Sequence, residues 1–232
     1  MSDSLELLQK LVDSFPRLNA NDPSTQDKEH DENGNIVKVR PNGFSCIFNK
    51  ELNLEFRNFE TQESTSRIVN FRILVKIGSS LEQIRFEVMD DADLYYFFEA
   101  IFDQELFNEM REKDQLTIDF SEFPLEVINL LQDCQKNDSE TQITFVEEND
   151  EAKSATMEFL QILELKAVEI FKIRFIPSDP LFVQDQVQYR FDQINKQLAY
   201  KKAYLTEFDK QIQSKNPILY KALTKSPRTL RK

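Results

Sequence analysis

The residues of this chain that could do chemistry are carboxylates, two cysteines and one histidine. Carboxylate pairs such as Asp90-Asp91 and Glu147-Glu148 could act as an acid and a base or hold a cation. In a chain with 41 Asp and Glu residues, however, such pairs are typical of solvated turns. His30 lies in a polar stretch without a nearby nucleophile, and no glycine-rich loop could hold a phosphate. We therefore expect neither enzyme activity nor a cofactor.

Metal binding is not predicted either. The run from Glu29 to Gly34 is similar to the start of a calcium loop, but its twelfth position is Arg40 and no helical pattern flanks it. Asn33-Gly34 is better interpreted as a tight turn. Cys46 and Cys134 lie in apolar contexts without CxxC spacing, which favours buried free thiols over a disulfide or a zinc site.

The composition is that of a folded protein. The chain is 40% hydrophobic and contains 20 Phe but 3 Gly, which favours a well-filled core. No apolar run reaches the roughly 18 residues that a membrane span requires, and the acidic N-terminus is unlike a secretory signal. We expect a cytoplasmic protein that does not bind membranes.

Charge divides the chain into two parts. Residues 181–232 hold 11 Lys and Arg against 4 Asp and Glu, which is +7, so residues 1–180 carry −19 of the net charge of −12. An acidic body lacks the clustered cations that phosphate contacts need, so no nucleic-acid partner is expected for it.

The first 40 residues are predicted to be a flexible N-terminal extension. Residues 4–15 have the apolar spacing of a short amphipathic helix. Residues 19–35 are rich in Asn, Asp, Ser, Pro, Lys and Glu and carry too little apolar surface to order themselves.

Residues 41–182 are predicted to form a mostly β head with inserted helices. Strand patterns occur at 44–48, 52–56, 68–77, 83–88, 142–146, 157–165 and 168–176. Leu116 to Phe120 also alternates apolar and polar residues, as a half-buried strand does. Ser121 is a plausible helix N-cap before Pro124. The pattern indicates a seven-stranded β-sandwich or barrel.

Four features in the middle of the head occur in a recognisable order. They are Asp90-Asp91-Ala92-Asp93 before an aromatic strand (Leu94 to Phe98), an acidic helix (Asp103 to Glu112), the Leu116 to Phe120 segment, and Phe123-Pro124 opening a helix that ends at Leu130-Leu131 and Cys134. This order resembles the signature block of the spindle assembly abnormal protein 6 family, the centriolar cartwheel proteins. The looser resemblance covers about residues 44–180, the whole predicted head.

The resemblance implies a structural protein. In the family, heads pair with heads and stalks pair in parallel, so that dimers close into a ninefold ring at the centriole or basal body. A tip hairpin carries an apolar knob, for which Leu165 followed by Lys166 is the candidate here, although about three residues including the usual Phe are missing. The alternative is that Leu165 is an interior residue of a tight β-hairpin. Two alternatives remain: a sister protein that lacks the long coil, at a ciliary or apical structure, and a DNA-repair scaffold-type adaptor with the same head fold.

After Pro180 the apolar period changes from two residues to heptads, which predicts a coiled-coil stalk over residues 183–216. Seven of nine consecutive seam positions are apolar, and the eight positions assigned to the interface are Val187, Phe191, Ile194, Leu198, Lys201, Leu205, Phe208 and Ile212. A lone helix folded back on the head is the alternative. Residues 217–232 are predicted to be a basic tail that could dock on acidic heads or on tubulin.

Overall fold

The computed structural model describes residues 3–33, 36–136, 139–148 and 154–224. The chain divides into two compact units, Met1–Val187 and Gln188–Lys232. Among the described residues, no helix is long and apolar enough to cross a membrane.

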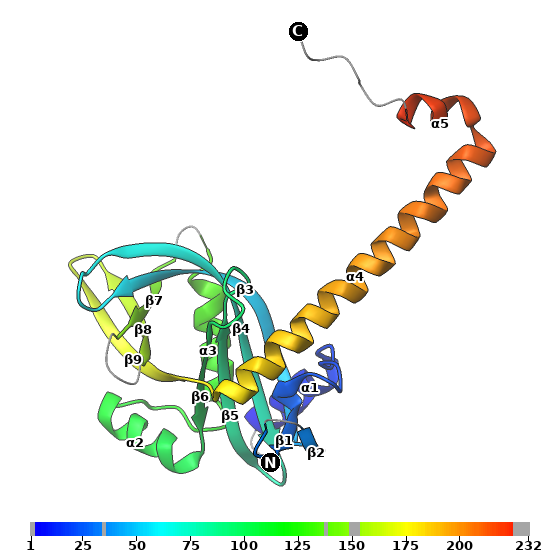
Figure 1. Ribbon diagram of the computed structural model, residues 1–232. Helices are drawn as coiled ribbons and strands as arrows, with labels where there is room; N and C mark the ends of the chain where they lie inside the picture. Colours follow the sequence, from blue (N-terminus) through cyan, green and yellow to red (C-terminus); the bar gives the residue numbers. More distant parts are fainter. Residues whose placement is uncertain (1–2, 34–35, 137–138, 149–153, 225–232) are drawn as a thin grey trace. The chain divides into compact units, whose positions relative to one another are not determined.

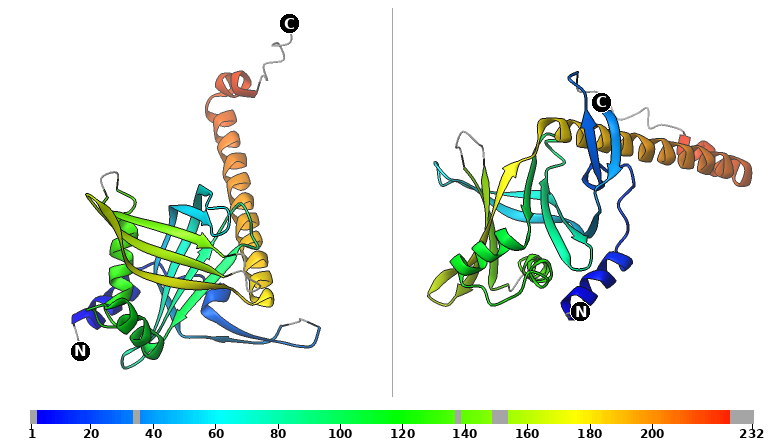
Figure 2. Two further views of the ribbon diagram at one scale, coloured as in Figure 1. Left: turned by 90° about the vertical axis from the view of Figure 1, so that its left-hand side faces the viewer. Right: turned by 90° about the horizontal axis from the view of Figure 1, so that it is seen from below.

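The first unit is built around a closed β-barrel (Figures 1 and 2). Its strands follow the order β3-β4-β5-β6-β9-β8-β7, and the ring closes where β3 pairs in parallel with β7, from Glu55↔Thr144 to Asn58↔Glu147. The strands are β3 (Phe44–Asn58), β4 (Ser64–Ile77), β5 (Leu81–Met89), β6 (Phe97–Phe102), β7 (Thr141–Glu147), β8 (Ala155–Leu163) and β9 (Lys166–Pro177). The predicted seven-stranded head with inserted helices is therefore confirmed.

Two predicted strands are one. The segments 44–48 and 52–56 belong to the continuous strand β3, with a bulge between Cys46 and Phe48. The polar residues Asn49 to Glu51 separate the two apolar segments in the sequence. In the structure Lys50 and Glu51 are exposed and pair in register with Phe71 and Asn70 of β4, so they form the solvent-facing part of a long strand.

The segment Leu116 to Phe120 is not a strand. Helix α2 (Gln104–Asp114) ends at Gln115, whose left-handed backbone (φ 55°) turns the chain into an irregular segment before helix α3 (Phe123–Asp133). Phe120 is buried against Phe107, with ring centroids 5.4 Å apart, so side-chain packing and not strand pairing explains the alternation. The α3 N-cap is Glu122, not Ser121.

The N-terminal 40 residues contain more structure than their composition predicted. Helix α1 (Asp3–Ser14) is the expected short helix, and its Leu8 is completely buried in the barrel core. The presumed flexible stretch carries a 3-10 turn, η1 (Pro23–Thr25), and a hairpin of β1 (Gln26–His30) and β2 (Ile36–Pro41). The prediction of a flexible segment from its polar composition was wrong, because hydrogen bonds and not apolar contacts hold the buried residues Asp22 and Ser24 in place.

The barrel core is a network of phenylalanine rings. Phe123, at the start of α3, is fully buried. Its ring lies 5.1–5.8 Å from four other rings, those of Phe86, Phe102, Phe107 and Phe171. Edge-to-face and tilted contacts at these distances stabilise the core beyond simple area burial.

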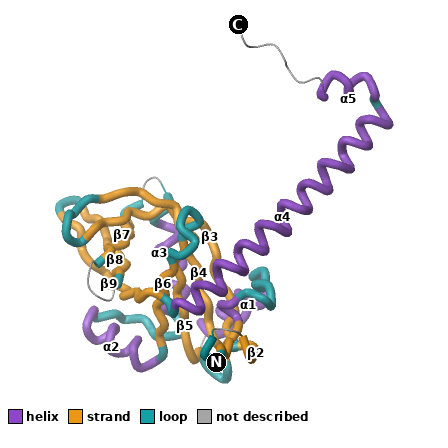
Figure 3. Tube along the Cα trace, viewed as in Figure 1, coloured by secondary structure: helices purple, strands orange, loops and turns teal. Residues whose placement is uncertain are grey.

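The second unit is helical. Helix α4 (Pro180–Lys215) starts in the first unit and continues through the predicted stalk without a break. Helix α5 (Pro217–Thr224) follows where a basic tail was expected (Figure 3). Pro217 does not prevent this, because a proline is tolerated in the first turn of a helix. Residues 225–232, with the remaining basic residues of that tail, lie outside the described residues.

Candidate functional site

The predicted knob lies at the tip of the β8–β9 hairpin. Leu163 pairs with Lys166, and Glu164 and Leu165 form the turn between them. Leu165 is 97% exposed, and Leu163 and Ile162 are also exposed. Leu165 is thus a projecting apolar side chain and not an interior residue of the hairpin.

A cavity of about 260 Å³ lies beside this hairpin. It is lined by Ile162 of β8 and by parts of β3, β7 and the chain after α3, namely Asn53, Leu54, Cys134, Lys136, Ser139, Thr141, Gln142 and Ile143. The apolar tip and the cavity therefore belong to the same end of the barrel.

The predicted stalk seam follows one face of α4. Beyond Val187, the apolar seam residues Phe191, Ile194, Leu198, Leu205 and Phe208 are 47–58% exposed. Val187 instead packs against the buried cluster of Met89, Phe97 and Val183. The apolar seam from Phe191 onward thus lacks a full complement of packing contacts within its own unit.

The first turns of α4 are held to the barrel by a buried polar cluster that the sequence did not predict. Gln186 is fully buried, and its Nε2 donates to Asp22 Oδ1 (3.2 Å) and to Ser24 Oγ (2.8 Å). Ser24 Oγ in turn donates to Glu87 Oε2 of β5 (2.9 Å). One chain of hydrogen bonds therefore joins η1, the barrel wall and α4.

Two arginines neutralise the acids of this cluster. Arg72 NH1 lies 3.2 Å from Asp22 Oδ2 and 3.8 Å from Glu87 Oε2. Arg85 contacts Glu87 Oε1 at 3.2 Å and Glu99 Oε2 at 2.7 Å. Burial raises the pKa of Glu87, while the charges of Arg85 and Arg72 oppose that rise.

An aromatic contact adds to the same junction. The guanidinium of Arg85 lies 4.7 Å from the ring centroid of Phe182 in the first turn of α4, which is a cation–π distance. Phe182 also packs edge-on against Phe97 at 5.3 Å. Lys28 of β1 pairs with Asp185 at 2.9 Å.

Sequence reasoning missed this cluster because its members are up to 164 positions apart. Along the sequence, Arg85 and Glu87 alternate with apolar residues, which is the pattern of a strand with one polar face. In the structure β5 is buried on both faces, since η1 and α4 cover its outer side. The only hint in the sequence was Gln186, a polar residue directly before Val187, the first residue of the predicted stalk seam.

The carboxylates that could have formed an acid–base pair have structural roles. Asp90 and Asp93 accept the backbone N–H groups of Ala92 and Tyr95 within their own turn. Glu147 accepts the Tyr96 hydroxyl at 2.8 Å and pairs with Arg67. In the part of the chain that the structure describes, no group of three or more His, Cys, Asp or Glu residues could hold a metal ion.

Both cysteines are free, as the sequence predicted. Burial raises the pKa of the Cys46 thiol to about 12 and also raises the pKa of Cys134. A thiolate is the nucleophilic form of cysteine, so neither thiol is activated for chemistry.

The comparisons with known proteins agree with this architecture. Residues 46–175 match the Centriolar protein SAS N-terminal domain. The spindle assembly abnormal protein 6 homolog of Danio rerio is 31% identical over 91 residues, 38% of this chain and 14% of that protein. The homolog of Gallus gallus is 23% identical over 195 residues, 72% of this chain and 30% of that protein. This chain thus spans less than a third of the length of either relative.

Solved structures share the fold. An N-terminal fragment of Leishmania SAS-6 with part of its coiled coil matches at a TM-score of 0.60 and 16% identity, covering 73% of this chain and 99% of that one. The N-terminal coiled-coil dimer of C. elegans SAS-6 matches at 0.55 and 17%, covering 71% and 99%. Since the family model matches more than half of the 232 residues, this chain belongs to the family of centriolar SAS proteins that carry this N-terminal domain.

Proposed function

We propose that this chain is a structural scaffold of the centriolar cartwheel, which pairs through its stalk and contacts further copies through its heads on the way to a ninefold ring. The observation that carries the proposal is the half-exposed apolar seam of α4 in a chain with a centriolar SAS head. A helix with so narrow an apolar stripe gains most by packing on a second helix of the same kind. The activity is assembly and not catalysis.

The positions that flank the seam permit pairing with a second copy. In a parallel two-stranded coil, each g residue faces an e residue of the partner helix. Here the g positions are Arg190, Gln197, Tyr204 and Gln211, and the e positions are Gln188, Asn195, Lys202 and Asp209. No such pair brings together two like charges. Lys201 at d would face itself, which weakens the coil and limits alternative registers.

Sedimentation velocity of the full chain over a range of concentrations tests the pairing. Leu198→Glu places a charge in the seam and should abolish the dimer, whereas Tyr200→Glu lies on the outer face, where the side chain is 74% exposed, and should not. A wild-type monomer at all concentrations, or a dimer that is as tight in Leu198→Glu as in the wild type, would contradict the proposed stalk contact.

For the head contact, we propose that Leu165 of one copy enters the cavity beside Ile162 of another. An isologous contact requires a self-complementary patch, and an exposed knob next to a cavity at one end of the barrel provides it. Leu is smaller than Phe and buries less apolar surface, so the contact is weak and depends on the stalk to raise the local concentration of heads.

The place of action follows from the same proposal: the cytoskeleton, at centrioles or basal bodies, with other centriolar proteins and tubulin as further partners. The described basic residues after the head, among them Lys201, Lys202, Lys210, Lys215 and Lys221, suit an acidic surface such as tubulin. Microtubule co-sedimentation of the chain should fall between roughly 50 and 300 mM salt as the charges are screened.

A fluorescent fusion should mark paired puncta or basal-body rows, and a diffuse signal would count against the proposal.

A further inference from the structure

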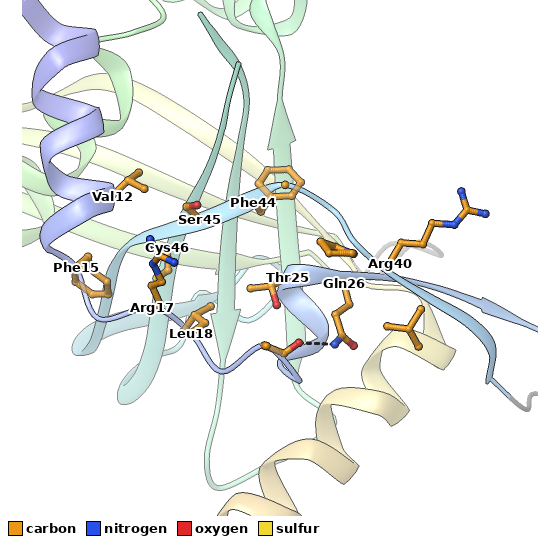
Figure 4. A pocket seen from close by; sticks show the side chains of 14 residues that line it. Val12, Phe15, Arg17, Leu18, Thr25, Gln26, Arg40, Phe44, Ser45 and Cys46 are labelled. Atoms are coloured by element: carbon orange, nitrogen blue, oxygen red, sulfur yellow. Dashed lines mark hydrogen bonds between the residues drawn. The ribbon is translucent and has the colours of Figure 1, made fainter. Parts of the chain in front are cut away.

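One cavity of the first unit lies outside the barrel, between the end of α1, the chain that follows it, and the corner from β2 into β3. It is a groove of about 470 Å³ (Figure 4). Its lining consists of Val12, Phe15, Arg17, Leu18, Ala20, Thr25, Gln26, Val39, Arg40, Pro41, Gly43, Phe44, Ser45 and Cys46. These residues are called the N-terminal groove below.

The N-terminal groove is not part of the family domain. That domain matches residues 46–175, and of the lining residues only Cys46 falls within it. Pairing through the stalk and the hairpin tip therefore does not account for the groove, and its role belongs to the N-terminal segment of this chain.

The charge of the groove is opposite to that of the protein. The chain has a net charge of −12, yet the lining contains two arginines and no carboxylate. Arg40 is paired with Glu29 at 2.7 Å. Arg17 has no ion-pair partner within the described part of the chain. A ligand of this groove gains from carrying negative charge.

Most of the remaining lining is apolar, and the apolar surface continues beyond the groove. Val12, Phe15, Leu18 and Phe44 form its apolar lining. Val39 also lines it, and Val37, two residues earlier on β2, points to the same side of the strand. Both valines are exposed, at 62% for Val37 and 47% for Val39. Exposed apolar side chains that continue a groove mark an interaction surface.

Strand β2 has a free edge beside this surface. In the described residues it pairs with β1 alone, and all six of its residues are exposed. The hairpin projects from the barrel in Figure 2. An unpaired edge can accept an added strand, with backbone hydrogen bonds giving affinity and side-chain pockets giving specificity.

We propose that the N-terminal groove binds an extended segment of a partner protein in which apolar and acidic residues alternate. The segment lies along β2, places apolar side chains against Val39 and Phe15, and sets a carboxylate on Arg17. Charge complementarity decides the partner: a basic or neutral segment leaves Arg17 without a counter-charge, and an acidic one supplies it.

Fluorescence anisotropy with a labelled peptide tests this on the full chain. The probe is fluorescein-Glu-Val-Glu-Leu-Glu-Phe-Glu, and its comparison peptide has Lys in place of every Glu. The acidic probe should bind saturably and the basic one should not. Arg17→Glu should weaken binding roughly tenfold, because an attractive charge pair becomes a repulsive one. Lys50→Glu, an equal charge change on β3 outside the lining, should leave binding unchanged.

A second variant covers the case in which Arg17→Glu disturbs folding. Val39→Glu alters a side chain that is already 47% exposed, so the fold tolerates it, and it too should weaken the acidic probe. Both effects should persist in a Leu198→Glu background, which separates the groove from stalk pairing.

Three outcomes overturn the proposal. The first is equal affinity for wild type, Arg17→Glu and Val39→Glu. The second is the absence of saturable binding by wild type. The third is self-association of the Leu198→Glu chain that both groove variants abolish, since the groove would then hold a second copy of this chain.

Discussion

The barrel and the stalk helix both carry large apolar side chains, but these are buried in the barrel and half-exposed on the stalk. Phe123 in the barrel is completely buried by side chains of its own chain, whereas Phe191 on α4 is 54% exposed. The barrel closes its own apolar surface, so its stability should not depend on concentration. If a second copy covers the apolar face of the stalk, as proposed, the stability of the stalk should depend on protein concentration. Folding of the barrel and assembly through the stalk would then be separate events.

The largest expected effect comes from emptying the barrel core. Phe123→Ala removes a ring packed against four others and should destabilise the head by about 3–5 kcal/mol, equally at all protein concentrations. Urea unfolding measures it. Phe59→Ala, at a ring that is 62% exposed, should have little effect. If the loss of unfolding free energy in Phe123→Ala depended on protein concentration, the barrel would not be stable independently of assembly.

The polar cluster at the start of α4 is the next test. Arg72→Met leaves the buried carboxylates of Asp22 and Glu87 without this cation and should cost about 3 kcal/mol. Arg111→Met removes an exposed pair with Asp119 and should cost under about 1 kcal/mol.

The same variant has a predicted pH dependence. Burial raises the folded-state pKa of Glu87 above its unfolded value, so this group stabilises the fold at low pH and loses that contribution as pH rises through the folded pKa. Without Arg72, one opposing charge is gone and the pKa rises further. The cost of Arg72→Met should therefore be smaller at pH 5 than at pH 7 in urea unfolding, and a cost that grows towards pH 5 would contradict the assignment.

Cys46, on strand β3 of the barrel wall beside the N-terminal groove, gives a smaller effect. Its pKa rises from 9.0 to about 12 on folding, so the stability that it contributes is complete below pH 9 and is lost as pH rises towards 12. Relative to Cys46→Ala, the wild type should lose on the order of 1 kcal/mol between pH 8 and pH 10. A constant difference across this range would show that the thiol is not buried in the native state.

The two regions also differ in how far the sequence predicts them. Most of the barrel could be predicted, because alternation such as that from Phe71 to Ile77 depends only on neighbouring residues. The exceptions are β3, which was expected as two strands, and β6, for which the expected aromatic strand, Leu94 to Phe98, starts three residues before the observed one. The continuous helix to Lys215 could be predicted for the same reason, because its apolar residues recur at heptad spacing. Whether the seam pairs remains a prediction, since it concerns a second molecule.

What could not be predicted depends on contacts between distant segments. Nothing local to Ser24 or Gln186 indicates that both side chains are buried, because their partners lie on other elements. The hairpin β1–β2 was missed because β1 is polar and the apolar residues of β2 are exposed, so strand pairing rather than apolar burial orders it. The prediction for Leu116 to Phe120 was wrong for the opposite reason, since a strand was expected where none forms. The alternation there reflects the packing of Phe120 against Phe107 and not pairing with another strand.

In the stalk, Lys201→Leu should sharpen the contrast with the barrel. Replacing the lysine that faces its own copy should stabilise the dimer by about 1 kcal/mol through added apolar burial, with a rise in Tm that depends on protein concentration. Tyr200→Leu, one position away on the outer face, is the matched control and should not change dimer stability. Equal Tm values for wild type and Lys201→Leu at every concentration would mean that α4 does not pair through this seam.

The smallest effect is expected at the hairpin tip, where the barrel itself would meet another copy. Leu165→Phe adds apolar surface to a side chain that is 97% exposed and should strengthen head–head association by at most about 1 kcal/mol. Leu165→Glu should weaken it, because a charge would enter an apolar contact. Sedimentation equilibrium in the Leu198→Glu background isolates this contact from stalk pairing. If neither substitution changes the affinity between heads, Leu165 is not part of the head–head contact. The stalk seam would then be the remaining assembly surface of the proposal.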